Sequence, residues 1–445
     1  MVNTSISLKH INKLAIPALI SGVSEPILSL TDAAIVGNIE FNATESLAAV
    51  GIVTTFLSML IWVLGQTRSA ISSIVSQYVG ANKLDKIKNL PAQAIFIITS
   101  LSVLIIIGTY PFANQIFKLY NASGLILDYS VDYYRIRVFG FPFTLFTIAV
   151  FGAFRGLQNT YYPMLIAIIG TITNVILDFA LVYGIDGYIT PMNIKGAAYA
   201  SVIAQLLMAI FAAYYLLKKT EIPLKLSFPF NKEINRFILM ILNLFVRTIA
   251  LNVTLYYASA FATSYGATYI AAYTIAINLW FLGAFIVDGY ASAGNILSGK
   301  LYGGKEYNLL IILSNKLIKY GIIIGILIAI VGGLLYYPLG NIFTNDPEVL
   351  KQFYSIFWIV LAMQPLCTIA FIFDGIFKGL GKMEALRNVL LISTFLVFIP
   401  VLFWLDHLDY KLYAIFIALT FWIIARGFPL ILIFRKIFIP LSKNN

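Results

Sequence analysis

The sequence predicts an all-α membrane protein with twelve transmembrane helices arranged as two six-helix lobes. Its composition is the first observation behind this fold class: 60% of the 445 residues are hydrophobic and 11% are charged, with a mean hydropathy of +0.90. Such a composition excludes a water-soluble globule. The second observation is an internal repeat, in which similar blocks of sequence recur at a constant offset of half the chain.

Apolar segments long enough to cross a bilayer recur along the whole chain. A helix needs about 20 apolar residues to cross roughly 30 Å of hydrocarbon. The segments are continuously apolar rather than alternating, which indicates helices and not strands. The first segment follows Lys9 and Lys13 as a signal peptide would, but it is too long and lacks a small-residue cleavage site, so we expect it to remain. The twelve predicted spans are 11–38, 46–79, 90–112, 128–156, 161–184, 194–217, 234–263, 267–299, 310–337, 350–378, 385–405 and 411–435.

The repeat relates the two halves of the chain residue by residue. Pro142 corresponds to Pro365, 223 residues later, and GAFRGL at 152–157 corresponds to GIFKGL at 375–380. Six spans in each half leave both halves inserted the same way up, so we expect them to be related by an axis along the membrane normal. Many secondary transporters are built in this way, with the substrate path between the halves.

The basic residues predict the orientation of the chain in the membrane. About 21 of the 30 Lys and Arg residues lie in the termini or in connections on the same side, against about six on the other side. The positive-inside rule therefore predicts that both termini lie in the cytoplasm, and we expect a multi-pass protein of the cell (inner) membrane. Arg135 and Arg137, near the outer end of the fourth span, are expected to reach the membrane surface by snorkelling. The polar stretch 218–236 is predicted to be a cytoplasmic linker between an N-terminal lobe, 1–217, and a C-terminal lobe, 237–445.

Several kinds of chemistry are excluded by what the sequence contains. Two histidines, His10 and His407, and one cysteine, Cys367, are too few to build a metal cluster with nearby carboxylates. No phosphate-binding loop of the form GxxxxGK[ST] occurs, so ATP is not expected as the energy source. The net charge of +11 is explained by topology and does not indicate nucleic-acid binding. We therefore expect neither an enzyme nor a cofactor, but a monomer that contacts membrane lipids and small organic molecules.

Ionisable residues inside the predicted spans are the candidates for function. A charge at the centre of a span costs about 2.5–3.5 kcal/mol on insertion scales, so each needs a partner, water or a function. Glu25 and Asp32 are seven residues apart and share a face of the first span, with Pro26 between them as a hinge. Asn174 and Asp178 are four apart and share a face of the fifth span. The candidate carboxylates inside the bilayer are Glu25, Asp32, Asp178, Asp288 and Asp374.

The repeat supplies an internal control for two of these carboxylates. In the second half, Leu255 stands at the position of Asp32 and Val401 at the position of Asp178. The carboxylates are therefore specific to one half, which favours an ion site over a symmetric scaffold, although a buried structural pair stays open. Two close carboxylates in a low dielectric must share a proton or bind a cation. The nearby amide of Asn174 favours direct Na⁺ binding with competition from H⁺.

The C-terminal half carries a different set of charges. Asp374 precedes Lys378 by one helical turn, which favours a local salt bridge. Arg247 lies near the middle of the seventh span and needs a counter-charge. By depth, Asp288 is the expected partner and Asp374 is the alternative. Whether these charges hold the lobe together or contact substrate stays open.

Motifs along the whole chain resemble those of one membrane family. The first, fifth and sixth spans resemble signatures of the multidrug and toxic compound extrusion (MATE) family in EPILSLTDAAIVGNI (25–39), LAAVG (47–51), TNVILDFALVYG (173–184) and GAAYASVIAQ (196–205). The second half resembles the DinF-like branch of that family in VRTIAL (246–251), DGYASAGNILSG (288–299) and DGIFKGLGKMEALRN (374–388).

The resemblance implies a V-shaped, two-lobed antiporter that exports organic, often cationic compounds in exchange for Na⁺ or H⁺. It also implies a coupling site in the N-terminal lobe, with a serine where relatives often carry threonine and with one tyrosine from the fourth span. A second branch of the family couples through acids in the C-terminal lobe, but here the aligned part of the tenth span carries Cys367 and Thr368. The implied site residues are Asp32, Asn174, Asp178, Ser201 and Tyr133, with Tyr134 as the alternative tyrosine.

Two other functions remain as alternatives. A flippase for lipid-linked precursors belongs to the same broader superfamily, but it should line its cavity with several basic side chains. Only Arg68, Arg247 and Arg426 are assigned to the interior of spans, so an exporter is preferred. A channel is not favoured by the buried carboxylates.

Overall fold

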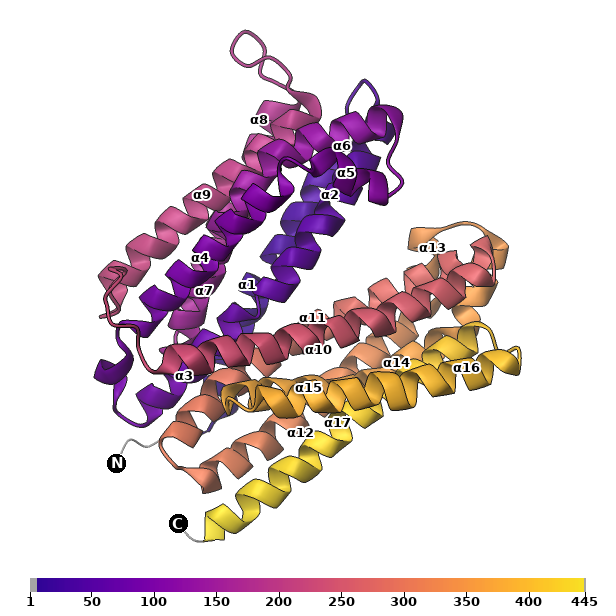
Figure 1. Cartoon of the computed structure of the whole chain (residues 1–445). Coiled ribbons are helices and arrows are strands. Elements are labelled where there is room, and N and C mark those ends of the chain that lie inside the picture. Colours follow the sequence, from indigo (N-terminus) through magenta and orange to yellow (C-terminus); the bar gives the residue numbers. More distant parts are fainter. Residues whose placement is uncertain (1–5, 444–445) are drawn as a thin grey trace. The chain divides into compact units, whose positions relative to one another are not determined.

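The computed structural model describes residues 6–443 and is helical along nearly its whole length (Figure 1). The helices of the first half are α1 (Leu8–Val36), α2 (Ala43–Leu64), α3 (Thr67–Gly80), η1 (Leu84–Ile87), α4 (Leu90–Thr109), α5 (Ala113–Leu119), α6 (Gly124–Arg137), η2 (Val138–Gly140), α7 (Phe141–Gly156), α8 (Tyr161–Val182) and α9 (Asn193–Lys219). Those of the second half are α10 (Glu233–Ser264), α11 (Ala267–Gly303), α12 (Tyr307–Leu334), α13 (Tyr336–Phe343), α14 (Pro347–Gly379), α15 (Met383–Ile392), η3 (Ser393–Phe398), α16 (Ile399–His407) and α17 (Leu412–Lys443).

Twelve helical stretches of the described chain are long and apolar enough to cross a membrane, which confirms the predicted number. Four of them are interrupted, and the third stretch, Leu84–Thr109, consists of η1 and α4. The second stretch has 38 residues and consists of α2 and α3, because α2 ends before Gly65 and the chain continues as α3. Pro142 opens α7 after a short 3₁₀ turn, and a π-helical turn before Pro400 divides the eleventh stretch. Proline at the first positions of a helix needs no amide partner, which explains why the chain restarts there.

The chain packs into two compact units, of which the N-terminal unit comprises residues 20–75 and 83–241. In it α8 packs along α9, α7 packs on α4 and α9, and α6 packs on α2 and α9 (Figure 1). Small side chains permit this: Ala197, Ala200 and Ala204 on α9 are fully buried. A Cβ on Gly170 of α8 would stand 2.3 Å from the side chain of Met208. Close approach through small residues is a general way for helices to associate in membranes.

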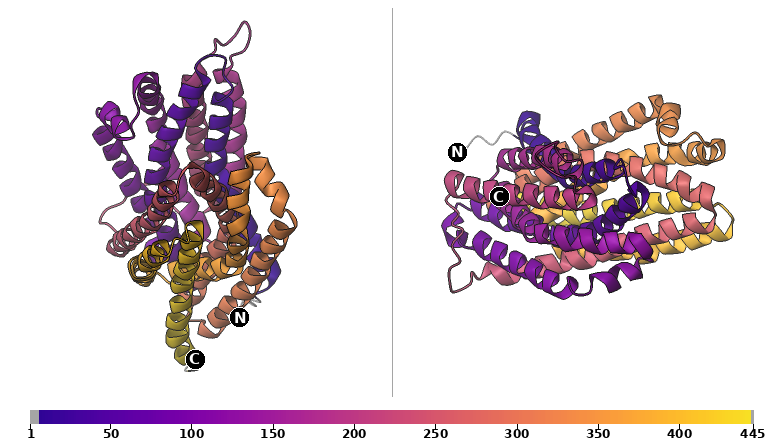
Figure 2. Two further views of the ribbon diagram at one scale, coloured as in Figure 1. Left: turned by 90° about the vertical axis from the view of Figure 1, so that its right-hand side faces the viewer. Right: turned by 90° about the horizontal axis from the view of Figure 1, so that it is seen from above.

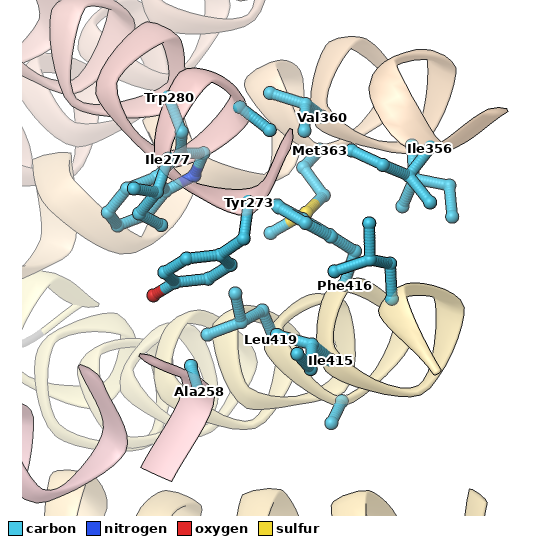
Figure 3. Packing of buried hydrophobic residues seen from close by; sticks show 14 of the residues in the cluster. Ala258, Tyr273, Ile277, Trp280, Ile356, Val360, Met363, Ile415, Phe416 and Leu419 are labelled. Carbon is cyan, nitrogen blue, oxygen red and sulfur yellow. The ribbon is translucent and has the colours of Figure 1, made fainter. Parts of the chain in front are cut away.

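The C-terminal unit comprises the described parts of residues 1–19, 76–82 and 242–445. Its central helix is α14, which packs against α11, α12 and α17, and the further views in Figure 2 show these helices running together. A Cβ on Gly375 would lie 2.1 Å from the carbonyl oxygen of Ala291, so α14 and α11 touch through their backbones. Figure 3 shows the apolar core between them, where Tyr273 and Trp280 of α11 meet Met363 of α14 and Phe416 of α17.

Two N-terminal segments belong to this C-terminal unit by packing. A Cβ on Gly80 would lie 1.8 Å from the carbonyl oxygen of Lys300, and a Cβ on Gly303 would lie 1.8 Å from that of Gln77. Gly80 and Gly303, like Gln77 and Lys300, are equivalent positions of the repeat, so α3 and α11 cross symmetrically at two glycines. Packing thus places residues 6–19 and 76–82 with the second half of the chain, whereas the sequence-based division at the linker places them with the first half. The predicted lobes of 1–217 and 237–445 stay a prediction.

Candidate cation site

The carboxylate of Asp32 is the centre of a buried polar cluster in the N-terminal unit. Its side chain is 1% exposed. The hydroxyl of Ser201 donates to Oδ2 at 2.7 Å, the hydroxyl of Tyr133 donates to the same atom at 3.1 Å, and Nδ2 of Asn174 donates to Oδ1 at 3.2 Å. The cluster therefore joins α1, α6, α8 and α9, and it brings together the residues that the family resemblance implies for the cation site.

Helical periodicity explains how α8 and α9 present these groups. Asn174 and Asp178 continue a buried stripe on α8 that repeats every three or four residues, while Ile176 and Phe179 point outward and are exposed. Ser201 lies among the buried alanines of α9. Because those alanines are small, α9 approaches α8 closely enough for Asn174 also to donate to the Ser201 hydroxyl at 3.3 Å.

Asp178 has no hydrogen-bond donor of its own among the described residues. Its side chain is fully buried, and its carboxyl group lies against that of Asp32. Both of its oxygens, and Oδ1 of Asn174, receive no hydrogen bond from any group that the structure describes. Buried oxygens are normally satisfied by a donor, and two adjacent carboxylates repel each other. These oxygens fit a bound cation or a shared proton.

The two candidate tyrosines of α6 have different partners. Tyr133 contacts Asp32, whereas the Tyr134 hydroxyl donates to Thr109 Oγ1 at 2.5 Å and its ring packs on Phe56 and Phe117. The structure thus places Tyr133, the preferred tyrosine, in the cluster. Both side chains are fully buried, so burial alone does not distinguish them.

Arg137 departs from the sequence-based expectation of snorkelling, which was wrong for this residue. It is 6% exposed, and its Nη1 donates to Oε1 of Gln205 on α9 at 2.9 Å. The guanidinium also lies beside the Tyr133 hydroxyl and within electrostatic range of Asp178. Arg135, by contrast, is exposed and lies over the ring of Tyr110. Sequence reasoning missed Arg137 and Gln205, although Arg137 follows Tyr133 by one turn and so shares its face.

Glu25 and Pro26 lie within α1, which continues unbroken to Val36. The side chain of Glu25 is outside the described residues. The hinge at Pro26 stays a prediction, based on the amide that proline cannot supply to the helix.

The C-terminal unit contains a second buried charge cluster, centred on Asp374. Lys378 contacts Asp374 at 2.8 Å, which confirms the expected salt bridge within α14. Arg247 of α10 also pairs with Asp374, and Arg426 of α17 lies 3.4 Å from it. The predicted pair of Arg247 with Asp288 is therefore wrong. Asp374 is almost fully buried, whereas Asp288 is partly exposed on α11, so the cations gather around the buried carboxylate.

Residues 6–443 do not form a metal centre built from several His, Cys, Asp or Glu side chains. They hold no group of three or more His, Cys, Asp or Glu side chains that could bind a metal ion. The cluster around Asp32 differs from such centres, because it combines two carboxylates with an amide and hydroxyls. Hard oxygen ligands of this kind suit a hard cation rather than a soft transition metal.

The comparison with known families decides which family the chain belongs to. The sequence model of the MatE family matches residues 17–180 and 244–404, which covers most of the chain. The chain belongs to the MatE family. This match confirms the family that the motifs of the sequence indicate. The protein is therefore a multidrug and toxin efflux transporter that passes through the membrane several times.

Curated MatE relatives extend over most of the chain. DNA damage-inducible protein F of Escherichia coli is 24% identical, with 95% of this chain and 91% of the relative covered. Protein DETOXIFICATION 42 of Arabidopsis thaliana is 25% identical, with 83% and 81% covered. Multidrug export protein MepA of Staphylococcus aureus is 25% identical, with 75% and 73% covered.

Solved MatE structures share the fold. A crystal structure of MATE in the bent conformation aligns with a TM-score of 0.90 at 21% identity, covering 98% of this chain and 96% of that chain. The Vibrio cholerae MATE transporter VcmN in the bent form aligns with a TM-score of 0.88 at 19% identity, covering 98% of each chain. At these identities the likeness supports the fold alone.

Proposed function

We propose that this MatE chain is a secondary active antiporter that exports organic, often cationic compounds in exchange for Na⁺ or H⁺. The observation that carries the proposal is the buried pair of carboxylates, Asp32 and Asp178, of which Asp178 receives no hydrogen bond from the described residues. The printed name of the relative MepA, a multidrug export protein, agrees with such a substrate class.

The electrostatics of the pair supply the coupling. Two carboxylates that touch in a low dielectric do not both stay ionised unless a cation lies between them. A proton on one of them would donate to the other, and Na⁺ would use oxygens of both. Oδ1 of Asn174 and the Ser201 hydroxyl add oxygen ligands that a proton does not need, which favours direct Na⁺ binding with H⁺ competing for the same place.

The membrane potential and the two-state cycle complete the mechanism. A cation that enters the cytoplasm with the potential contributes about 2.3 kcal/mol per charge per 100 mV. Export requires that ion and drug favour opposite states of the protein or compete for one state, because equal binding to both shifts nothing. A bend at Pro26, six residues before Asp32 on α1, would let occupancy of the site alter the helix that carries it.

The flippase alternative gains no support from the buried basic residues. Arg137 contacts Gln205, Arg155 contacts the hydroxyl of Ser21, and Arg247 contacts Asp374. Such arginines are engaged by protein partners within one unit, whereas recognition of a pyrophosphate would need several basic groups directed at the ligand.

Transport by the purified protein in proteoliposomes tests the proposal. Ethidium or a fluoroquinolone is placed on the cytoplasmic side, and Na⁺ and H⁺ gradients are imposed separately. We expect an inward Na⁺ gradient to drive export, an inward H⁺ gradient to drive it as well, and the two ions to compete. No gradient-dependent movement of either compound, in protein that binds Na⁺ normally, would contradict an exporter of such compounds.

The proposed orientation in the inner membrane predicts a labelling pattern. Lys225 in the connection between α9 and α10, and Asn345 between α13 and α14, are both exposed. In a Cys367→Ala background, a cysteine at position 345 should react with a membrane-impermeant maleimide in intact cells, and one at 225 should react only after the cells are opened. Cys367 itself is buried, and the Trp280 indole donates to its sulfur at 3.1 Å, so its removal should matter little for topology. The reverse pattern would show that the termini lie outside.

A further inference from the structure

Arg137 adds a fixed positive charge to the buried carboxylates of the cation site. We propose that Arg137 is an internal counter-ion that limits the site to one monovalent cation. The inference rests on the proposed function, because it assumes that the Asp32 and Asp178 cluster binds the coupling cation. In this role, Arg137 sets the number of cations that the site binds.

Two contacts hold Arg137 in place. Nη1 donates to Oε1 of Gln205 at 2.9 Å, and the guanidinium lies beside the Tyr133 hydroxyl, which itself donates to Asp32. Gly140 in η2 makes room for the first contact. A Cβ at Gly140 would stand 1.9 Å from Oε1 of Gln205 and 3.4 Å from Nη1 of Arg137. The chain thus keeps a glycine where any side chain would push Gln205 off the arginine.

The described charges of the cluster sum to a single negative charge. Asp32 of α1 and Asp178 of α8 each carry one negative charge when ionised, and Arg137 of α6 carries one positive charge that does not titrate in proteins. A further charged pair on these elements, Lys195 with Asp132, lies on the exposed surface with 3.0 Å between the charged atoms and neutralises itself. One Na⁺ or one proton therefore completes the neutrality of these three buried groups, because buried charges need compensation.

Removing the arginine charge should strengthen Na⁺ binding, whereas ordinary structural damage to the site would weaken it. In Arg137→Gln the two carboxylates face a cation without an internal counter-ion. Na⁺ should then bind on the order of tenfold more tightly, or two Na⁺ ions should bind per protein, since charges inside proteins interact at an effective dielectric constant near 20 even at buried sites. A residue that merely shapes the site would, when lost, weaken Na⁺ binding.

Calorimetry or radioactive Na⁺ binding on the purified full-length protein at one fixed pH tests the inference. Wild type should bind one Na⁺, Arg137→Lys should keep that number, and Arg137→Gln should show the tighter or doubled binding. Arg135→Gln is the matched control, two residues away on an exposed side chain, and should behave as wild type. Weaker or unchanged Na⁺ binding in folded Arg137→Gln would overturn the inference.

Folding of the variant supplies a second measurement. If Arg137→Gln does not fold, the cause should be the two uncompensated carboxylates, and Arg137→Gln/Asp178→Asn should restore both the folded protein and binding of one Na⁺. A double variant that still fails to fold would contradict the counter-ion role. Failure of the proposed function looks different: wild type itself would move neither ethidium nor a fluoroquinolone under an imposed gradient, although it binds Na⁺.

Discussion

Asp32→Asn and Asp178→Asn proteins should reach the membrane in normal amounts and fail to export ethidium or a fluoroquinolone under either cation gradient. Each substitution keeps the size of the side chain and removes one negative charge from the buried pair. With Arg137 in place, the site is then already neutral and no longer attracts a cation. Without cation binding the gradient cannot bias one state of the transporter, so export should fall at least about a hundredfold, towards the rate of passive leak.

The matched control for these variants is Asp132→Asn. Asp132 precedes Tyr133 on α6, but its carboxylate pairs with Lys195 at 3.0 Å on the exposed surface, where a salt bridge contributes about 0–1 kcal/mol. Export by this control should match wild type. Expression, thermal unfolding and Na⁺ binding are measured on the same preparations. Full export by either carboxylate variant under both gradients would refute coupling at this site.

Much of the site could be predicted because its signals are local in the sequence. The four-residue spacing of Asn174 and Asp178 indicates one face of a helix, and the absence of both carboxylates from the second repeat indicates a specialised half. Contact between α1, α6, α8 and α9 is not encoded in such spacings. It entered through the resemblance to a family, and the structure then placed the four hydrogen-bonding groups together.

The two errors have a common physical reason. Sequence indicates how deep a residue lies along a span, but not which way its side chain turns about the helix axis. Depth made Asp288 the expected partner of Arg247, yet α14 directs Asp374 at α10. Likewise, Arg135 and Arg137 are two residues apart on α6 and lie at similar depth, yet Arg135 is exposed whereas Arg137 is buried against Gln205. Rotation about the axis is set by packing, which the sequence alone does not show.

The Asp374→Asn protein should be strongly destabilised, so that little folded protein is recovered. The substitution leaves Arg247, Lys378 and Arg426 facing one another inside the C-terminal unit without their common anion. Removing one partner of a buried ion pair typically destabilises by about 3–5 kcal/mol, and three cations around one site place this variant at the upper end. The aromatic faces of Phe371 and Trp422, 4.9 and 5.5 Å from the Arg426 guanidinium, offset only part of that loss.

Variants of the cations should be milder, because each leaves two others with Asp374. Thermal unfolding in detergent, read by fluorescence-detected size exclusion, should therefore rank Asp374→Asn well below Arg247→Met, with Asp288→Asn close to wild type. Asp288 is the matched carboxylate control, since it lies on α11 and does not pair with Arg247 in the structure. Equal damage from Arg247→Met and Asp374→Asn would mean that the two form an isolated pair. A loss of thermal stability confined to Asp288→Asn would contradict the observed cluster. Asp288, and not Asp374, would then be the carboxylate that pairs with the cations.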